Sequence, residues 1–83
     1  MRRVTLYTRA GCHLCDEAKQ VLERARAGEP FDLEILDIDG NAELRRLYDH
    51  EVPVIAIDGV KAFKYRLTEA DLLKKLRARR PAG

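Results

Sequence analysis

The stretch Arg9-Ala10-Gly11-Cys12-His13-Leu14-Cys15-Asp16-Glu17 contains both cysteines of the 83-residue chain. Before it, residues 4–8 are β-branched and aromatic, a composition that favours a strand. After it, apolar residues recur at helical spacing as far as Ala25, and Gly28 and Pro30 indicate the end of the helix. The two cysteines, three positions apart, therefore open a helix directly after a strand.

The start of a helix gives the two cysteines different environments. The first turn of a helix has unpaired backbone N–H groups and a partial positive charge, and both favour the thiolate of Cys12 over its thiol. Helical phase places Cys15 on the same face as Ala18 and Leu22. We therefore expect Cys15 to point inward and Cys12 to face solvent, which is the arrangement that thiol–disulfide exchange requires.

Length and composition predict one small domain spanning residues 1–83. No segment approaches the ~20 apolar residues of a membrane span, and no apolar run of signal-peptide length follows the N-terminus. We therefore expect a cytoplasmic monomer with no membrane partner. In that compartment two cysteines indicate redox or metal chemistry before a structural disulfide. A net charge of +2, with only two Phe and three Tyr, argues against a nucleic-acid partner.

The middle of the chain predicts a second strand and a short second helix. Residues 31–39 alternate between apolar and polar, with a change of phase that indicates a kink near Leu36. A turn with a capping residue follows at Asp39-Gly40-Asn41, and residues 42–50 predict a short helix. Its predicted buried stripe is Leu44, Leu47 and Tyr48.

The last third of the chain predicts a hairpin and a third helix. Residues 53–57 form the predicted third strand, Asp58-Gly59 is a strong hairpin signal, and residues 60–65 form the fourth strand. Thr68 begins a capping box for the last helix, and residues 77–83 predict a frayed tail. The predicted inner face of that helix is Leu72, Leu73 and Leu76. The predicted order is thus βαβαββα.

Two further motifs accompany the cysteine pair. Arg9 stands three positions before Cys12, and Glu51-Val52-Pro53-Val54 precedes a short apolar strand. With the C-x-x-C that opens a helix, they make the chain resemble a glutaredoxin-like protein of the thioredoxin superfamily, most closely an uncharacterised branch with the run Cys-His-Leu-Cys-Asp-Glu-Ala. The resemblance implies an α/β, thioredoxin-like (glutaredoxin) fold. This is a four-stranded mixed sheet of order 2-1-3-4 with three helices, two on one face and one on the other.

The resemblance also implies a set of site residues. Cys12 and Cys15 would form the redox-active disulfide, and Arg9, at the position where glutaredoxins contact glutathione, would lie near the Cys12 sulfur. Pro53 would follow a cis peptide bond, and the backbone of Val52 would pair with the substrate as a short strand. Glutaredoxins usually have Gly-Gly and an acidic residue after the fourth strand, whereas residues 63–69 of this chain contain no glycine.

We therefore expect a small thiol–disulfide oxidoreductase that reduces protein or small-molecule disulfides through Cys12 and Cys15. Glutathione or a thioredoxin reductase would serve as electron donor, with no tightly bound cofactor and no metal. A structural zinc site needs four ligands, and the chain has only two Cys and two His. Two alternatives stay open: an iron–sulfur or metal carrier using Cys12, and a thioredoxin-fold interaction module whose cysteines have lost their redox role.

Overall fold

The computed structural model describes residues 2–78, and strand β1 (Arg3–Thr8) lies at the centre of its sheet. Helix α1 (His13–Gly28) follows β1 directly, and strand β2 (Asp32–Asp37) comes next. The β-branched and aromatic residues of β1 and the helical spacing of the apolar residues in α1 account for these elements. β1 and α1 both lie where the sequence predicts them.

The second half of the chain supplies the remaining elements. A 3₁₀ turn, η1 (Ile38–Gly40), leads into helix α2 (Ala42–Tyr48). Strands β3 (Val54–Ile57) and β4 (Val60–Lys64) form a hairpin, and helix α3 (Glu69–Ala78) ends the described chain. Apart from the added 3₁₀ turn, the predicted order βαβαββα is confirmed.

The four strands form one mixed sheet in the order β2-β1-β3-β4. β1 is parallel to β2 and antiparallel to β3, and β3 is antiparallel to β4. Tyr7 near the end of β1 lies opposite Leu36 of β2 and Val54 of β3. The end of β1, the end of β2 and the start of β3 therefore lie at the same edge of the sheet. The strand order implied by the family resemblance is confirmed.

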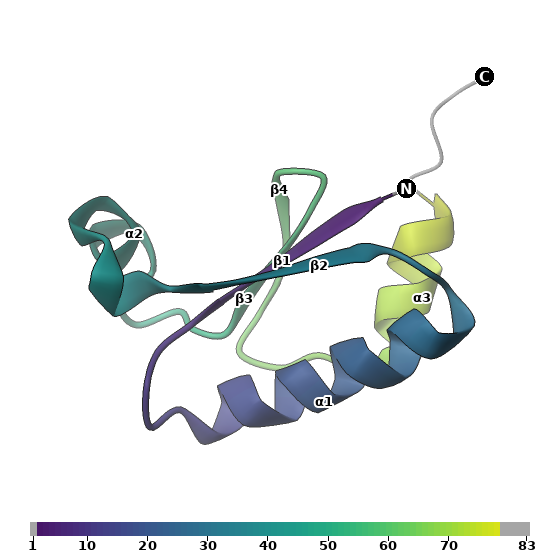
Figure 1. The fold of residues 1–83 in the computed structure, drawn as a ribbon, viewed down its shortest axis with the longest axis horizontal. Coiled ribbons are helices and arrows are strands. Elements are labelled where there is room, and N and C mark those ends of the chain that lie inside the picture. The colour runs from purple at the N-terminus through teal and green to yellow at the C-terminus, as the bar shows by residue number, and fades with distance from the viewer. Residues whose placement is uncertain (1, 79–83) are drawn as a thin grey trace.

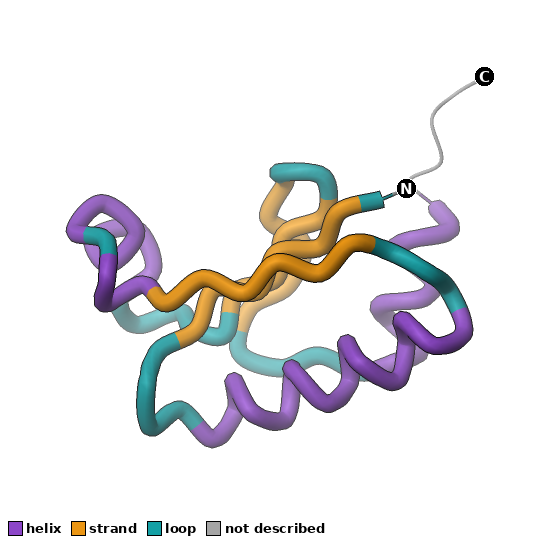
Figure 2. The backbone as a smooth tube through the Cα atoms, viewed as in Figure 1, coloured by secondary structure: helices purple, strands orange, loops and turns teal. Residues whose placement is uncertain are grey.

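The hydrophobic core lies between the sheet and the helix pair α1 and α3, which cover the same face (Figures 1 and 2). β1 and β3 contribute alternate residues to this face, and α1 contributes a stripe at helical spacing. The buried cluster consists of Val4, Leu6, Ala18, Leu22, Ala25, Phe31, Ile55, Ile57, Leu72 and Leu76. α2 lies on the other side of the sheet, at one end of it (Figure 1).

The hairpin and the last helix begin as their sequence signals predict. Asp58 and Gly59 both have positive φ angles, +52° and +85°, which is the backbone of a tight two-residue hairpin turn. The Thr68 hydroxyl accepts a hydrogen bond from the backbone N–H of Asp71 at 3.1 Å and caps α3. Of the predicted inner face of α3, Leu72 and Leu76 are buried and Leu73 is half-buried. Arg77 and Ala78, which the sequence assigns to the tail, still belong to α3, and residues 79–83 lie outside the described residues.

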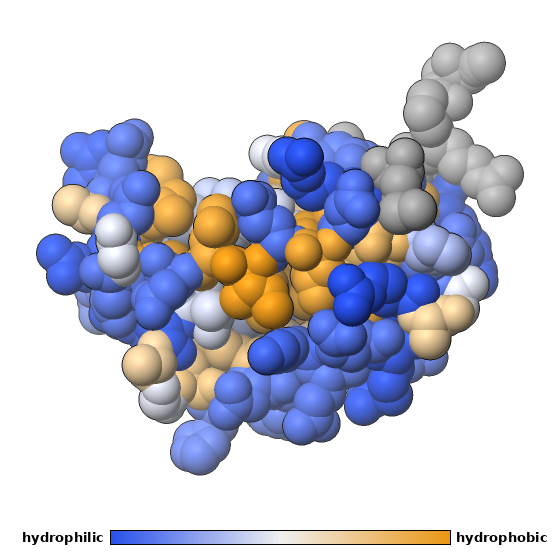
Figure 3. Space-filling view, viewed as in Figure 1, coloured by the Kyte–Doolittle hydropathy of each residue, from blue (hydrophilic) through white to orange (hydrophobic). Residues whose placement is uncertain are grey.

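The second strand is shorter than its sequence pattern predicts. One strand with a kink was expected over residues 31–39, but β2 ends at Asp37 and the chain turns through η1. The Asp37 carboxylate accepts a hydrogen bond from the backbone N–H of Asp39 at 2.8 Å and so caps this turn. β2 is an edge strand without a buried residue, its Ile35 is exposed, and apolar surface is visible on this side of the molecule (Figure 3).

Helix α2 corrects a second prediction, because none of its residues is buried. Leu44 is only half-buried and Leu47 is 52% exposed, although both were assigned to its buried stripe. The η1 turn places α2 at one end of the sheet (Figure 1), and Tyr48 is the last residue of the helix. There the ring of Tyr48 packs on the ring of Tyr7 with 4.7 Å between centroids. Burial, followed by the neighbouring Tyr48 and Glu34, raises the pKa of Tyr7.

We predict that Tyr48→Ala loosens the attachment of α2 and leaves the rest of the fold intact. An aromatic pair contributes about 0.5–1.5 kcal/mol beyond its buried area, and α2 has no buried side chain to replace that contact. Native-state hydrogen exchange should show faster exchange across Ala42–Tyr48 and unchanged protection in β1 and β3. Leu47→Ala is the matched control, because an exposed side chain contributes little. Equal exchange in the two variants would contradict this account of α2.

Candidate active site

Cys12 and Cys15 form a disulfide at the start of α1, with their Cα atoms 5.2 Å apart. Cys12 is the N-cap residue of α1 and is half-buried, whereas Cys15 is only 2% exposed. Helical phase therefore separates the two sulfur atoms as the sequence suggests: Cys15 lies on the buried face with Ala18 and Leu22. Of the pair, Cys12 is the cysteine that is more accessible to solvent.

The backbone at the start of α1 is directed at the Cys12 sulfur. The backbone N–H of Cys15 donates to Cys12 Sγ at 3.1 Å, and the N–H of Asp16 donates to the Cys12 carbonyl at 3.2 Å. Gly11, with φ of +77°, provides the left-handed residue that turns the chain from β1 into this cap. When the disulfide is reduced, a donor and the positive end of the helix dipole would face Cys12, and both favour its thiolate.

Pro53 lies at the same edge of the sheet, directly before β3. Its side chain is fully buried, Val52 is half-buried, and the peptide bond between them is cis. The antiparallel register opposes Val54 to Tyr7, so the segment before β3 runs past the segment that follows β1. The Pro53 carbonyl accepts a hydrogen bond from the backbone N–H of Tyr65 at 2.9 Å, which ties this segment to the end of β4.

Arg9 is paired with two acidic side chains of neighbouring segments. Its Nη2 lies 2.7 Å from Asp39 Oδ1, in η1, and its Nη1 lies 2.8 Å from Asp49 Oδ1, at the C-cap of α2. Nη1 also donates to the Asp49 carbonyl at 2.8 Å. The sequence predicts that this guanidinium lies near the Cys12 sulfur, where it could also pair with a substrate carboxylate. In the structure its donors contact the carboxylates of Asp39 and Asp49.

This cluster of Arg9, Asp39 and Asp49 does not supply a net positive charge to the site. The hydrogen bonds from Arg9 hold the pKa of Asp39 below its ordinary value, and the same contacts raise the pKa of Arg9. Asp39 and Arg9 are therefore both charged at neutral pH, and the cluster sets two carboxyl groups against one guanidinium. Arg9 joins the segment before Cys12 to η1 and to the end of α2, which is a mechanical role.

Two features of the site were not found from the sequence. Asp39 and Asp49 were interpreted as turn and helix-end residues, and no local pattern indicates that both contact Arg9. Tyr65 lies beside the site with φ of +68°, a conformation that favours glycine. The one indication in the sequence is that this segment contains no glycine, so a positive φ within it must fall on a residue with a side chain.

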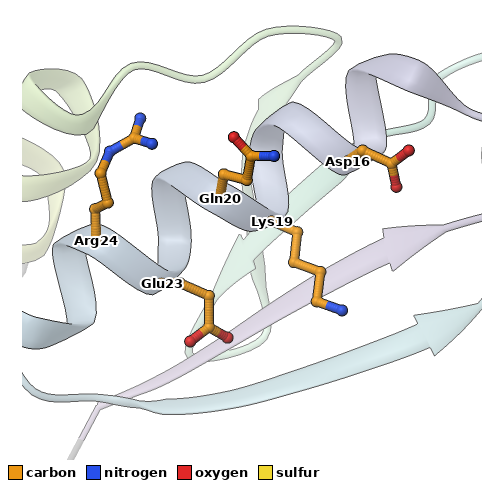
Figure 4. A pocket seen from close by; sticks show the side chains of 5 residues that line it. All are labelled: Asp16, Lys19, Gln20, Glu23 and Arg24. Atoms are coloured by element: carbon orange, nitrogen blue, oxygen red, sulfur yellow. The ribbon is translucent and has the colours of Figure 1, made fainter.

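A separate hollow lies on the exposed face of α1, and neither Cys12 nor Cys15 lines it. Its lining side chains spread from both sides of the helix into solvent (Figure 4). They are Asp16, Lys19, Gln20, Glu23 and Arg24. Within residues 2–78, no group of three or more His, Cys, Asp or Glu side chains is placed to hold a metal ion. In that same part of the chain, no helix is long and apolar enough to cross a membrane.

We predict that Arg9→Gln lowers the melting temperature at neutral pH and that the difference from wild type shrinks in acid. The pKa of Asp39 lies below its ordinary 3.8 in the folded state because Arg9 donates hydrogen bonds to its carboxylate. The ion pair therefore stabilises the fold fully above the unfolded-state pKa and loses this effect as pH falls through the folded-state pKa. Thermal melts of both proteins from neutral pH to below 3.8 measure the difference.

Arg46→Gln is the control for Arg9→Gln, because it removes the same charge from an exposed ion pair. Arg46 Nη2 lies 3.9 Å from Glu43 Oε1 on the surface of α2. Removing this charge should shift the melting temperature much less, since surface ion pairs of this kind contribute little. A pH-independent difference between Arg9→Gln and wild type would show that packing of the arginine stem, and not the ion pair, carries the effect.

Comparisons with known proteins agree with this geometry. Residues 3–77 match the family model "Glutaredoxin-like domain (DUF836)". A relative in Dictyostelium discoideum, "Glutaredoxin-like protein YDR286C homolog", is 33% identical over 75 residues, covering 83% of this chain and 69% of its own length. An uncharacterised protein of Mycobacterium bovis is 34% identical over 62 residues, covering 69% of this chain and 64% of its own length.

Solved structures extend the likeness to the fold. An X-ray structure of a target protein from X. campestris has a TM-score of 0.78 and 32% identity, covering 90% of this chain and 96% of that chain. The thioredoxin of Fasciola hepatica, at 18% identity, shares the fold with a TM-score of 0.69, covering 95% of this chain and 81% of that chain. With its thioredoxin-like fold and its Cys12–Cys15 pair, the chain belongs to the glutaredoxin-like (DUF836) family.

Proposed function

We propose that the protein is a thiol–disulfide oxidoreductase that reduces disulfides through Cys12 and Cys15. One observation carries the proposal: the two cysteines form a disulfide at a helix N-terminus, with Cys12 accessible and Cys15 buried behind it. A purely structural disulfide here would stabilise little, because it closes a loop of only two intervening residues. Reversible exchange explains both the position of the pair and the unequal exposure of its members.

The reaction proceeds in two exchange steps. The Cys12 thiolate attacks one sulfur of the substrate disulfide, forming a mixed disulfide and releasing the other sulfur as a thiolate that takes up a proton. Cys15 then loses its proton and attacks Cys12 Sγ, which releases the second substrate thiol and leaves the Cys12–Cys15 disulfide. Two electrons pass from the protein to the substrate. An external dithiol or two monothiols then reduce the Cys12–Cys15 disulfide. The N–H of Cys15, 3.1 Å from Cys12 Sγ in the disulfide, stabilises the Cys12 thiolate that attacks the substrate.

We predict that the two cysteine variants fail at different steps. Cys12→Ser should lose all exchange because no accessible nucleophile remains. Cys15→Ser should capture a substrate as a mixed disulfide that persists, because nothing attacks Cys12 Sγ from within the protein. Mass spectrometry after incubation with a peptide disulfide distinguishes the two outcomes. If Cys15 of the reduced wild-type protein is alkylated before Cys12, the assignment of roles is reversed.

The structure weakens the expectation that glutathione is the electron donor. Arg9, the proposed contact for a glutathione carboxylate, already donates to Asp39 and Asp49. At the other end of the site, the segment after β4 presents Tyr65 and Arg66 where a close-approaching backbone is needed, for which glycine is the usual solution. These contacts argue against glutathione and leave a thioredoxin-reductase-type donor as the other expected source of electrons.

We predict that glutathione binds the oxidised protein weakly and that a thioredoxin reductase regenerates it faster. Each missing charge-assisted hydrogen bond costs roughly 1.5–3 kcal/mol, or about ten- to a hundredfold in affinity. Calorimetric titration of glutathione into the oxidised protein, and regeneration rates with each donor, test this prediction. Arg9→Ala should leave the weak binding unchanged, since its guanidinium is already occupied. Tight, saturable binding of glutathione that falls in Arg9→Ala would contradict it.

A further inference from the structure

A small cavity lies between the first turns of α1 and the segment that joins β4 to α3. Its volume is about 120 Å³. Leu14 and Ala18 of α1 form one wall, and Tyr65 and Leu67 form the other. Figures 1 and 2 show this joining segment passing over α1 on its way to α3.

Both walls of the cavity belong to segments that carry the redox site. Leu14 stands between Cys12 and Cys15 in the first turn of α1. Tyr65 is tied to Pro53 by the 2.9 Å hydrogen bond from its backbone N–H to the Pro53 carbonyl. A peptide whose disulfide meets Cys12 would therefore place a neighbouring side chain at the mouth of this cavity.

The size and chemistry of the cavity favour an apolar side chain. Leu14, Ala18, Tyr65 and Leu67 supply the apolar part of the walls, and the two charged lining residues, Glu17 and Arg66, have opposite signs, so the cavity attracts neither an anion nor a cation by net charge. A dry cavity of about 150 Å³ accommodates benzene, so the space here suits one aliphatic side chain of a substrate. A larger group with its own ammonium and carboxylate would need separate partners for both charges.

Tyr65 has a backbone conformation that marks it out from its neighbours. Within residues 2–78 the non-glycine residues with positive φ are Asp58, in the hairpin turn, and Tyr65, with φ of +68°. The hydrogen bonds from the Tyr65 N–H to Pro53 and from the Arg66 N–H to the Lys64 carbonyl, at 2.8 Å, hold this conformation. The residue is 44% exposed, so burial does not explain why a large side chain is kept in a glycine-like conformation.

We propose that Tyr65 is a specificity-determining residue, whose ring completes a cavity for an apolar side chain next to the cysteine of a peptide disulfide. This inference rests on the proposed function and names its substrate class: extended peptides with an aliphatic residue beside the disulfide-bonded cysteine. Discrimination by an apolar cavity is set by how much of the substrate side chain it contacts. A single methylene changes kcat/KM by about tenfold or more when the fit is close.

The test compares peptide disulfides that are identical except for Leu, Ala or Asp beside the cysteine. Wild-type protein should reduce the Leu peptide with a kcat/KM at least about tenfold above that of the Ala peptide, and the Asp peptide should be no better than Ala. Tyr65→Phe, which keeps the ring, should retain the preference, and Tyr65→Ala and Leu14→Ala should lose most of it. Gln20→Ala, on the exposed face of α1, is the control and should behave as wild type.

The outcomes separate this inference from the function on which it rests. If wild type reduces all three peptides at equal rates, the inference is wrong and the oxidoreductase function stands. If no disulfide is reduced by any donor, the proposed function itself fails and the inference fails with it. Should Tyr65→Ala not fold, Tyr65→Gly relieves the backbone and removes the same ring, and a preference retained in that variant would overturn the role of Tyr65.

Discussion

The pairing of β1 with both of its neighbours is the constraint on which the site depends. Val4 and Leu6 anchor β1 in the core, and its last residues lie opposite the end of β2 and the start of β3. Because β1 is parallel to one neighbour and antiparallel to the other, three connections converge at one edge of the sheet. They are the segments that carry Cys12, Asp39 and Pro53, and β4, paired with β3, brings Tyr65 to the same edge. Each of these four residues therefore lies close, along the chain, to the end of a strand.

Much of this arrangement could be predicted from the sequence because the signals are local and consistent with one another. The apolar spacing of α1 places Cys15 on the core face, and the same spacing leaves Cys12 at the cap. The Asp58-Gly59 turn and the Thr68 cap depend on residues within four positions of each other, so neighbouring sequence suffices to predict them. The strand order, in contrast, came from the family resemblance, since alternation within a strand does not specify its neighbours.

The length of β2, the burial of α2 and the partners of Arg9 were not predicted correctly from the sequence. In each case the apolar or polar pattern of a segment competes with another contact, either a local cap or a residue that is distant in sequence. Asp37 caps a 3₁₀ turn, so the alternating pattern that continues to Asp39 does not become strand. That turn places α2 at one end of the sheet, so Leu47, which its helical spacing predicts to be buried, is left exposed. Arg9 pairs with carboxylates 30 and 40 positions away, a partnership that no local pattern encodes.

The two sides of the site are therefore held by different forces. α1 is fastened by buried apolar side chains, so Cys12 and Cys15 stand on the rigid part of the molecule. α2 has no buried residue and is fastened mainly by the Arg9–Asp49 ion pair and one aromatic contact, both partly exposed, and such contacts open more easily than a packed core. Because Arg9 is engaged in that attachment and faces two carboxyl groups, it adds little to the electrostatics of the sulfur. Stabilisation of a Cys12 thiolate is then left to the N-terminus of α1 and the N–H of Cys15, groups that the core holds in place whatever α2 does.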